Sequence, residues 1–141
     1  MKKAAGKSAI SDPDIEIRIP VSGFVRLNSY EQEILRSPWV QRLRRIRQLG
    51  LTDMVYPGAM HTRLEHALGV MHLANRAIEV LSKEGKEKQE QRFTSIHKAL
   101  ERMQQVVRVA ALLHDVGHAP LSHASEDLFP KKTTGGKFKH E

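Results

Sequence analysis

Residues 108–123 read RVAALLHDVGHAPLSH, an apolar run that ends in a cluster of polar, metal-capable side chains. The apolar part belongs to a helix expected over residues 94–115. Its spacing predicts one buried row, made of Leu100, Met103, Val107, Ala110 and His114. Gly117 is expected to end this helix, and Pro120 prevents its continuation. The stretch therefore predicts a buried helix whose last turn presents a histidine and an aspartate.

His114 and Asp115 are adjacent, about 100° apart around a helix, so at its last turn both can reach one ion lying between them. The negative end of the helix dipole favours a cation at this place. Histidine and carboxylate together suit Mn²⁺, Fe²⁺, Zn²⁺ or Mg²⁺. His66 is the candidate third ligand from a neighbouring helix. His118 and His123 follow on the turn and can face the same cavity without binding the metal.

Each of these residues also has an ordinary structural explanation. A single buried histidine is more often a hydrogen-bonded core residue than a ligand. His118 could cap a helix end, and Arg63 and Glu65 could be surface charges. The metal interpretation depends on several such residues occurring together.

Hydrophobic periodicity predicts a second long helix over residues 62–83. Its apolar stripe contains Leu64, Ala67, Leu68, Met71, Ala74, Ile78 and Leu81. Its polar stripe contains Glu65, His72, Arg76, Glu79 and Lys83. Residues 83–92 are charged and are expected to form an exposed connection to the next helix.

The segment before these helices predicts a small β element and two shorter helices. IEIRI (15–19) alternates apolar and polar residues, and FVRL (24–27) can pair with it as a hairpin. Residues 29–37 form an expected helix with a capping box between Ser29 and Gln32. A further helix is expected over 39–49, with Pro38 in its first turn and Gly50 at its end. The predicted class is mostly α with a small β-hairpin.

Composition narrows the class of protein. The chain has 141 residues, about one domain, and has no cysteine, which excludes disulfides and thiolate metal sites. No apolar run approaches a membrane span, and no signal peptide is visible, so a cytoplasmic protein is expected. The net charge of +7 favours anionic partners. Residues 1–14 are expected to be a disordered basic tail, 121–129 a short helix and 130–139 a basic loop.

Several motifs together resemble the HD-domain metal-dependent phosphohydrolases. HTRLEH (61–66) and LLHDVGHAPLSH (112–123) carry this resemblance. QRLRRIRQLG (41–50), YPGAMHTRLEHALGV (56–70) and the closing HE (140–141) make it closest to the deoxynucleoside-triphosphate triphosphohydrolase branch, which includes bacterial dGTPases and animal dNTPases with a sterile-alpha-motif domain. The resemblance spans residues 15–141 and implies an HD-domain helical core with an N-terminal β-hairpin.

In that family a divalent metal ion is held by His, His-Asp and a later Asp. The first three correspond to His66, His114 and Asp115. The later Asp has no counterpart before Glu141. The resemblance therefore predicts that residues 15–141 are the N-terminal portion of an HD domain, ending before its last metal ligand.

The same resemblance implies roles in substrate binding and catalysis. Substrate phosphate or sugar would be contacted by Arg63, Gln48, Leu49, His118 and His123. His118 and His123 would surround the triphosphate at the catalytic centre. His140 would be the catalytic general acid, with Glu126 assisting it.

The implied reaction converts a deoxynucleotide substrate, a dNTP, to deoxynucleoside and triphosphate, in a homo-oligomer. Other HD phosphohydrolases, which act on monophosphates, alarmones or cyclic dinucleotides, share the same metal core. A non-catalytic module that binds nucleic acid or regulates a partner is the remaining alternative. It is favoured by two basic runs, Arg42, Arg44, Arg45 and Arg47, and Lys131, Lys132, Lys137 and Lys139. Arg42 and Arg45 could equally be solvated charges that flank the apolar stripe of a helix, and the lysines would equally suit a loop near triphosphate or no function.

Overall fold

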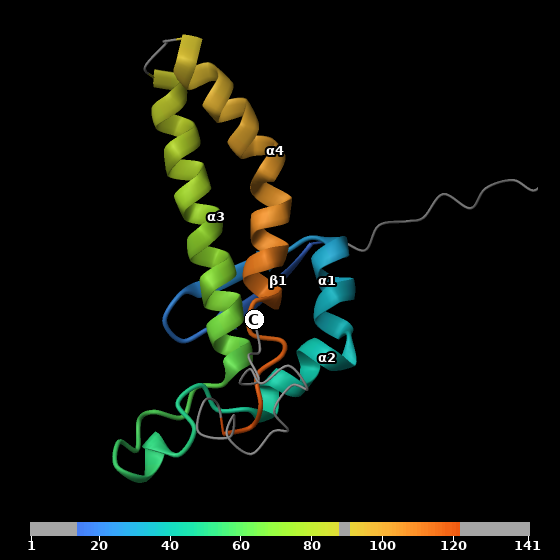
Figure 1. The fold of residues 1–141 in the computed structure, drawn as a ribbon, viewed down its shortest axis with the longest axis vertical. Coiled ribbons are helices and arrows are strands. Elements are labelled where there is room, and N and C mark those ends of the chain that lie inside the picture. Colours follow the sequence, from blue (N-terminus) through green and yellow to red (C-terminus); the bar gives the residue numbers. More distant parts are fainter. Residues whose placement is uncertain (1–13, 88–90, 122–141) are drawn as a thin grey trace, which may run out of the picture.

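Two long antiparallel helices dominate the computed structural model, which describes residues 14–87 and 91–121 (Figure 1). Helix α3 spans Arg63–Glu87 and helix α4 spans Gln91–Leu113. The predicted mostly helical class is confirmed. The exposed connection expected over 83–92 is wrong for its first half, because α3 continues to Glu87. The predicted basic tail, the short helix at 121–129 and the basic loop at 130–139 lie almost wholly outside the described residues.

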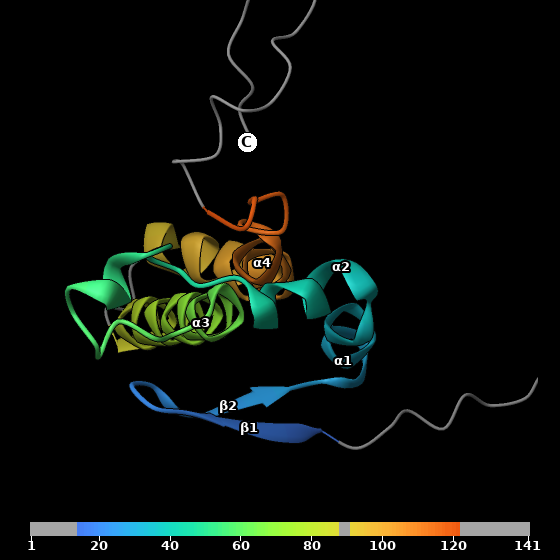
Figure 2. The ribbon, with the colours of Figure 1, turned by 90° about the horizontal axis from the view of Figure 1, so that it is seen from below.

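The predicted hairpin is confirmed. Strand β1 (Ile15–Ile19) pairs antiparallel with β2 (Gly23–Leu27), with Ile17 opposite Val25. Gly23 has a positive φ of 74°, which the turn into β2 requires and glycine adopts at little cost. Figure 2 shows the hairpin covering one side of the α3–α4 pair, with the turn after α4 on the opposite side.

Helix α1 (Ser29–Arg36) begins at the residue that was predicted to cap it, Ser29. The capping residue is Asn28, whose Oδ1 accepts a 2.9 Å hydrogen bond from the Glu31 backbone, while Glu31 Oε2 accepts one of 3.1 Å from the Asn28 backbone. The predicted box between Ser29 and Gln32 is therefore wrong by one position. Asparagine and glutamate satisfy the same two backbone donors as the predicted pair would.

The helix expected over 39–49 is much shorter in the structure. Helix α2 spans Pro38–Gln41 and continues as the 3₁₀ helix η1 (Arg42–Arg45), after which Ile46 is extended. Arg47 then forms a β-bridge with Thr62, so the chain pairs with the segment that leads into α3. Gly50 does adopt a positive φ of 58°, but in the loop rather than at a helix end. A second 3₁₀ helix, η2 (Thr52–Met54), interrupts that loop.

The core lies between α3, the end of α4, the hairpin and the α1–η1 segment. Its largest fully buried apolar side chains are Leu27, Leu43, Met71 and Leu112. The predicted buried row of α4 is wrong, because Met103 is 53% exposed and the His114 side chain 37% exposed. Ala111, Leu112 and Asp115 are buried instead. The buried face of α4 is thus rotated from the expected row, and His114 lies at its edge.

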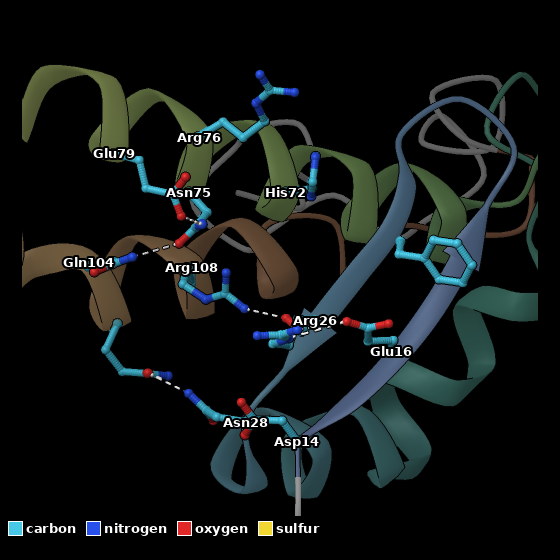
Figure 3. A pocket seen from close by; sticks show the side chains of 12 residues that line it. Asp14, Glu16, Arg26, Asn28, His72, Asn75, Arg76, Glu79, Gln104 and Arg108 are labelled. Carbon is cyan, nitrogen blue, oxygen red and sulfur yellow. Dashed lines mark hydrogen bonds and ion pairs between the residues drawn. The ribbon is translucent and has the colours of Figure 1, made fainter. Parts of the chain in front are cut away.

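A buried ion pair joins the start of α1 to α4. Arg108 Nε lies 2.6 Å from Glu31 Oε1, and its Nη2 donates to Glu31 Oε2 at 2.8 Å. The same Nη2 donates to the Arg26 carbonyl at 2.7 Å, as Figure 3 shows. The Glu31 side chain is fully buried. Its hydrogen bonds raise the pKa of Arg108 above the ordinary value, since they favour the charged guanidinium. Three elements, β2, α1 and α4, are therefore fixed by one guanidinium.

The cleft of about 750 Å³ beside this pair is lined by polar groups of the hairpin, α3 and α4 (Figure 3). Many of these groups bond to one another. Arg26 pairs with Glu16 at 2.9 Å, and Asn75 joins Glu79 and Gln104 by hydrogen bonds of 2.6 and 2.8 Å. Hydrogen bonds within the hairpin, within α3 and between α3 and α4 therefore order part of the wall of this cleft. No helix in the described part of the chain combines the length and apolar character needed to cross a membrane.

Replacing Glu31 with glutamine is expected to lower the free energy of unfolding by on the order of 3 kcal/mol, because it leaves the Arg108 charge without its buried partner. The measurement is urea unfolding followed by circular dichroism. Glu33→Gln is the control, since Glu33 is exposed on the same helix. Equal midpoints for the two variants would contradict this account of the ion pair.

Candidate metal centre

The antiparallel arrangement brings the first turn of α3 beside the residues that follow α4. His66 comes from α3, His114 directly follows the last residue of α4, and Asp115 is next to it. One ligand atom from each of these three residues lies within 4.8 Å of the others. The structure thus brings together the three residues that the sequence nominated as ligands, 48 and 49 positions apart along the chain.

Asp115 is the centre of this group. Its side chain is only 8% exposed, and its Oδ2 lies 2.6 Å from Nη1 of Arg63. Its Oδ1 lies 3.3 Å from Nε2 of His114 and 3.3 Å from Nε2 of His118. Nε2 of His66 is 3.8 Å from Oδ2. A carboxylate that is removed from water to this extent needs such partners, because an unpaired buried charge is costly.

The backbone of α4 fixes the tautomer of His114. Its Nδ1 lies 2.7 Å from the carbonyl oxygen of Ala111. Because a carbonyl can only accept, Nδ1 carries the proton, and in the neutral ring Nε2 keeps its lone pair. Nε2 is the atom that faces Asp115. This bond therefore orients the ring as a metal-binding histidine requires.

His66 is also held in its neutral form. Burial lowers the pKa of its imidazole below the ordinary value, since removal from water disfavours the charged ring, and this outweighs the attraction of Asp115. The rings of His66 and His114 meet edge to face, with centroids 5.3 Å apart. Two imidazoles and one carboxylate form a donor set suited to a divalent transition metal. Both histidines are about one third exposed, which leaves access for water or substrate.

The structure gives the remaining predicted residues different environments. Arg63, expected to contact phosphate or lie on the surface, is 2% exposed and paired with Asp115. His118 is buried and also contacts Asp115. Gln48 is bonded through its backbone to the His61 carbonyl at 3.1 Å, and Leu49 is half exposed beside it. His123, Glu126 and His140 lie outside the described residues.

Two structural contributions to this site were not predicted from the sequence. Thr62 and Glu65 form a capping box at the start of α3, with Glu65 Oε2 accepting from the Thr62 backbone at 2.6 Å. The pattern Thr-x-x-Glu was a readable signal for it. Arg42, interpreted as part of a basic run or a solvated flank, donates to the carbonyls of Val116 and His118. No local pattern indicates that contact.

The basic run is only partly available to an anionic partner. Besides Arg42, Arg47 forms an ion pair with Asp53 and holds the pKa of that carboxyl below its usual range. Arg44 donates to Gln41 at 2.7 Å. Two of the four arginines that suggested nucleic-acid binding therefore already bind groups of this chain. Arg47 fixes the loop, and Arg42 fixes the turn after α4.

Fold and site together define an α-helical protein with an N-terminal hairpin and a His-His-Asp candidate metal centre between two antiparallel helices. The HD-domain family profile matches residues 63–141, which is more than half of the chain. The chain belongs to the HD-domain family.

The similar proteins include deoxynucleoside triphosphate triphosphohydrolase SAMHD1 of Danio rerio, 38% identical over 86% of this chain and 18% of the relative. SAMHD1 of Bos taurus is 38% identical over 99% of this chain and 22% of the relative. A solved structure of a hypothetical protein from Aquifex aeolicus is 36% identical, with a TM-score of 0.66 over 92% of this chain and 29% of that one. The chain spans about a fifth of the length of these SAMHD1 proteins.

Mn²⁺ is expected to raise the melting temperature of this protein, because an ion that binds only the folded state stabilises it, by about 2.7 kcal/mol at 100 times the dissociation constant. The rise should disappear in His66→Ala and His114→Ala. It should persist in His72→Ala, which removes a histidine of α3 outside the group. Differential scanning fluorimetry with increasing Mn²⁺ makes the comparison. A similar rise in all four proteins would count against this site.

Proposed function

We propose that this chain forms part of a metal-dependent phosphohydrolase that cleaves dNTPs to deoxynucleoside and triphosphate. The observation that carries the proposal is the group of His66, His114 and Asp115 at one end of the α3–α4 pair. Membership of the HD-domain family supports phosphohydrolase chemistry, and the names of the SAMHD1 relatives support a dNTP as substrate. The activity requires a divalent metal; Mn²⁺, Mg²⁺, Fe²⁺ and Zn²⁺ all suit the donor set.

The residues of the group fit such an ion by their chemistry. His66, His114 and Asp115 would hold it through two nitrogens and one oxygen. When bound, a divalent ion supplies a positive charge that polarises a phosphoryl oxygen and acidifies water. The remaining contributions come from the chain itself.

Arg63 fixes the carboxylate on which the group depends. Its 2.6 Å contact to Oδ2 of Asp115 limits the rotation of that side chain. His118 approaches the other oxygen, so both oxygens of Asp115 have defined neighbours. We also assign Arg63 a phosphate contact in the substrate complex, where its guanidinium adds positive charge beside the group.

Gln48 and Leu49 are proposed to meet the sugar. The Oε1 atom of Gln48 is buried, and no group in the described part of the chain donates a hydrogen bond to it. That oxygen can accept from a sugar hydroxyl. Leu49 offers an apolar surface, against which a 2′-hydroxyl would lose its hydration without gaining a partner. This pair would favour deoxyribose over ribose.

Proton transfer to the leaving group is assigned to His140. Water supplies an oxygen to the α-phosphorus, the bond from that phosphorus to the 5′ oxygen breaks, and the 5′ oxygen takes a proton. His140, assisted by Glu126, would provide that proton, since imidazole titrates near neutral pH. His123 would line the triphosphate. These three roles, and assembly as a cytoplasmic homo-oligomer, rest on the resemblance of the sequence motifs.

Product analysis tests the proposal. Purified protein is incubated with Mn²⁺ or Mg²⁺ and each of the four dNTPs, and triphosphate and deoxynucleoside are quantified by anion-exchange chromatography. Triphosphate release is expected, with a loss of 100-fold or more, on the order of 3 kcal/mol, in Asp115→Asn. His72→Ala should retain activity. Release of phosphate or pyrophosphate in place of triphosphate would reject the dNTP reaction and favour another HD phosphohydrolase.

The nucleic-acid alternative predicts a different result. DNA binding would fall steeply with salt and would be unchanged in Asp115→Asn, because phosphate contacts need no metal group. Fluorescence anisotropy of labelled DNA at several salt concentrations measures this directly. Such binding in a protein that hydrolyses no nucleotide would overturn the enzymatic proposal.

A further inference from the structure

The structure assigns a positioning role to Arg42, which lies 72 residues before His114 in the sequence and outside the metal-binding group. We propose that its guanidinium holds the turn after α4 in the shape that the metal site needs. The inference rests on the proposed metal site and extends it to a residue outside that site.

The contact is a fork between one side chain and two backbone groups. Nη1 of Arg42 donates to the Val116 carbonyl and Nη2 to the His118 carbonyl, both at 2.8 Å. The two carbonyls flank Gly117. Only the planar guanidinium presents two parallel donors at a fixed separation, so lysine cannot reproduce this contact.

Within the described part of the chain, the backbone of this turn makes two hydrogen bonds of its own. Among the described glycines, a positive φ is found at Gly23 and Gly50, so Gly117 does not end the helix with the left-handed cap that the sequence suggested. The turn's own hydrogen bonds are Val116 N to Leu113 O at 3.0 Å and His118 N to Asp115 O at 3.1 Å. Its carbonyls carry the partial negative charge of a helix end, which the half-buried guanidinium of Arg42 stabilises.

The same turn carries two residues of the site. Asp115 immediately precedes Val116, and His118 provides one of the two carbonyls held by Arg42. A shift of these carbonyls would therefore move the carboxylate and the imidazole that approaches it at 3.3 Å.

The segment that carries Arg42 also holds the opposite side of the site. The Ile46 carbonyl accepts a 2.8 Å hydrogen bond from the Arg63 backbone, and Gln48 N donates to the His61 carbonyl at 3.1 Å. Residues 42–48 thus contact both chain segments that supply ligands. Arg42 sets the position of the α4 side relative to the α3 side.

Arg42→Lys and Arg45→Lys form a matched pair for the test. Arg45 is exposed on the same 3₁₀ helix and makes no interaction of this kind in the described part of the chain. Binding of Mn²⁺ alone is measured by isothermal titration calorimetry. Arg42→Lys is expected to weaken the affinity for Mn²⁺ by about 10-fold or more, as the loss of a residue that positions a metal ligand does. Arg45→Lys is expected to leave this affinity unchanged. Equal affinities in the two variants would overturn the assignment.

Two further readouts separate this inference from the proposed function. Hydrogen exchange at the Val116 and His118 amides should accelerate in Arg42→Lys, with the urea midpoint close to that of Arg45→Lys. Trp39, the one tryptophan, lines a cavity of about 470 Å³ with Arg42, Val116 and Gly117, so its emission should also shift. If the wild-type protein binds no Mn²⁺, the proposed metal site is refuted. If amide exchange and Trp39 emission are unchanged in Arg42→Lys, the role of Arg42 is refuted. If Arg42→Lys does not fold, Arg42→Gln, whose amide reaches one carbonyl, replaces it.

Discussion

The ion pair between Arg63 and Asp115 joins the first turn of α3 to the residue pair that follows α4, and both side chains are more than nine-tenths buried. Separating these charges would leave an unpaired ion in the interior, which costs several kcal/mol. The pair therefore fixes how the two helices meet at this end. It also gives Asp115 a defined orientation, so that each surrounding histidine lies near a particular oxygen of the Asp115 carboxylate. The orientation of the carboxylate at the centre of the candidate site follows from this contact.

A second buried pair, Glu31 with Arg108, plays the corresponding part on the other side of α4. It attaches the hairpin and α1 to the middle of that helix. The two pairs lie at different heights along α4 and engage different neighbours. Between them α4 has little freedom to slide or rotate, and the half-exposed ring of His114 is presented at the edge of the buried face. At that position the ring of His114 is both oriented and accessible, as a metal ligand must be.

Much of this arrangement could be predicted from the sequence, and the failures have physical causes. The hairpin and most of α3 follow from periodicity, because the predicted stripe of α3 is buried or partly buried from Leu64 to Ile78, although Leu81 is 52% exposed. His66, His114 and Asp115 stand out by chemistry and motif. The buried face of α4 was predicted wrongly. An apolar row shows which side chains can be buried, but it does not show which element packs against the helix. Arg42 was read as a solvated charge for a related reason. Its partners are backbone carbonyls, which have no signature in a sequence.

The contact of Arg42 with the turn after α4 also has a consequence for the order in which contacts form as the chain folds. Its hydrogen bonds close loops of 74 and 76 residues, whereas α3 and α4 are separated by a short connection and can pair early. The α3–α4 pair can then exist before η1 docks against it, with the histidines near one another but the turn not yet shaped. On the role proposed for Arg42, the geometry for holding an ion forms only with this long-range closure. A chain in which the closure has not formed carries His66, His114 and Asp115 without the turn that would position them.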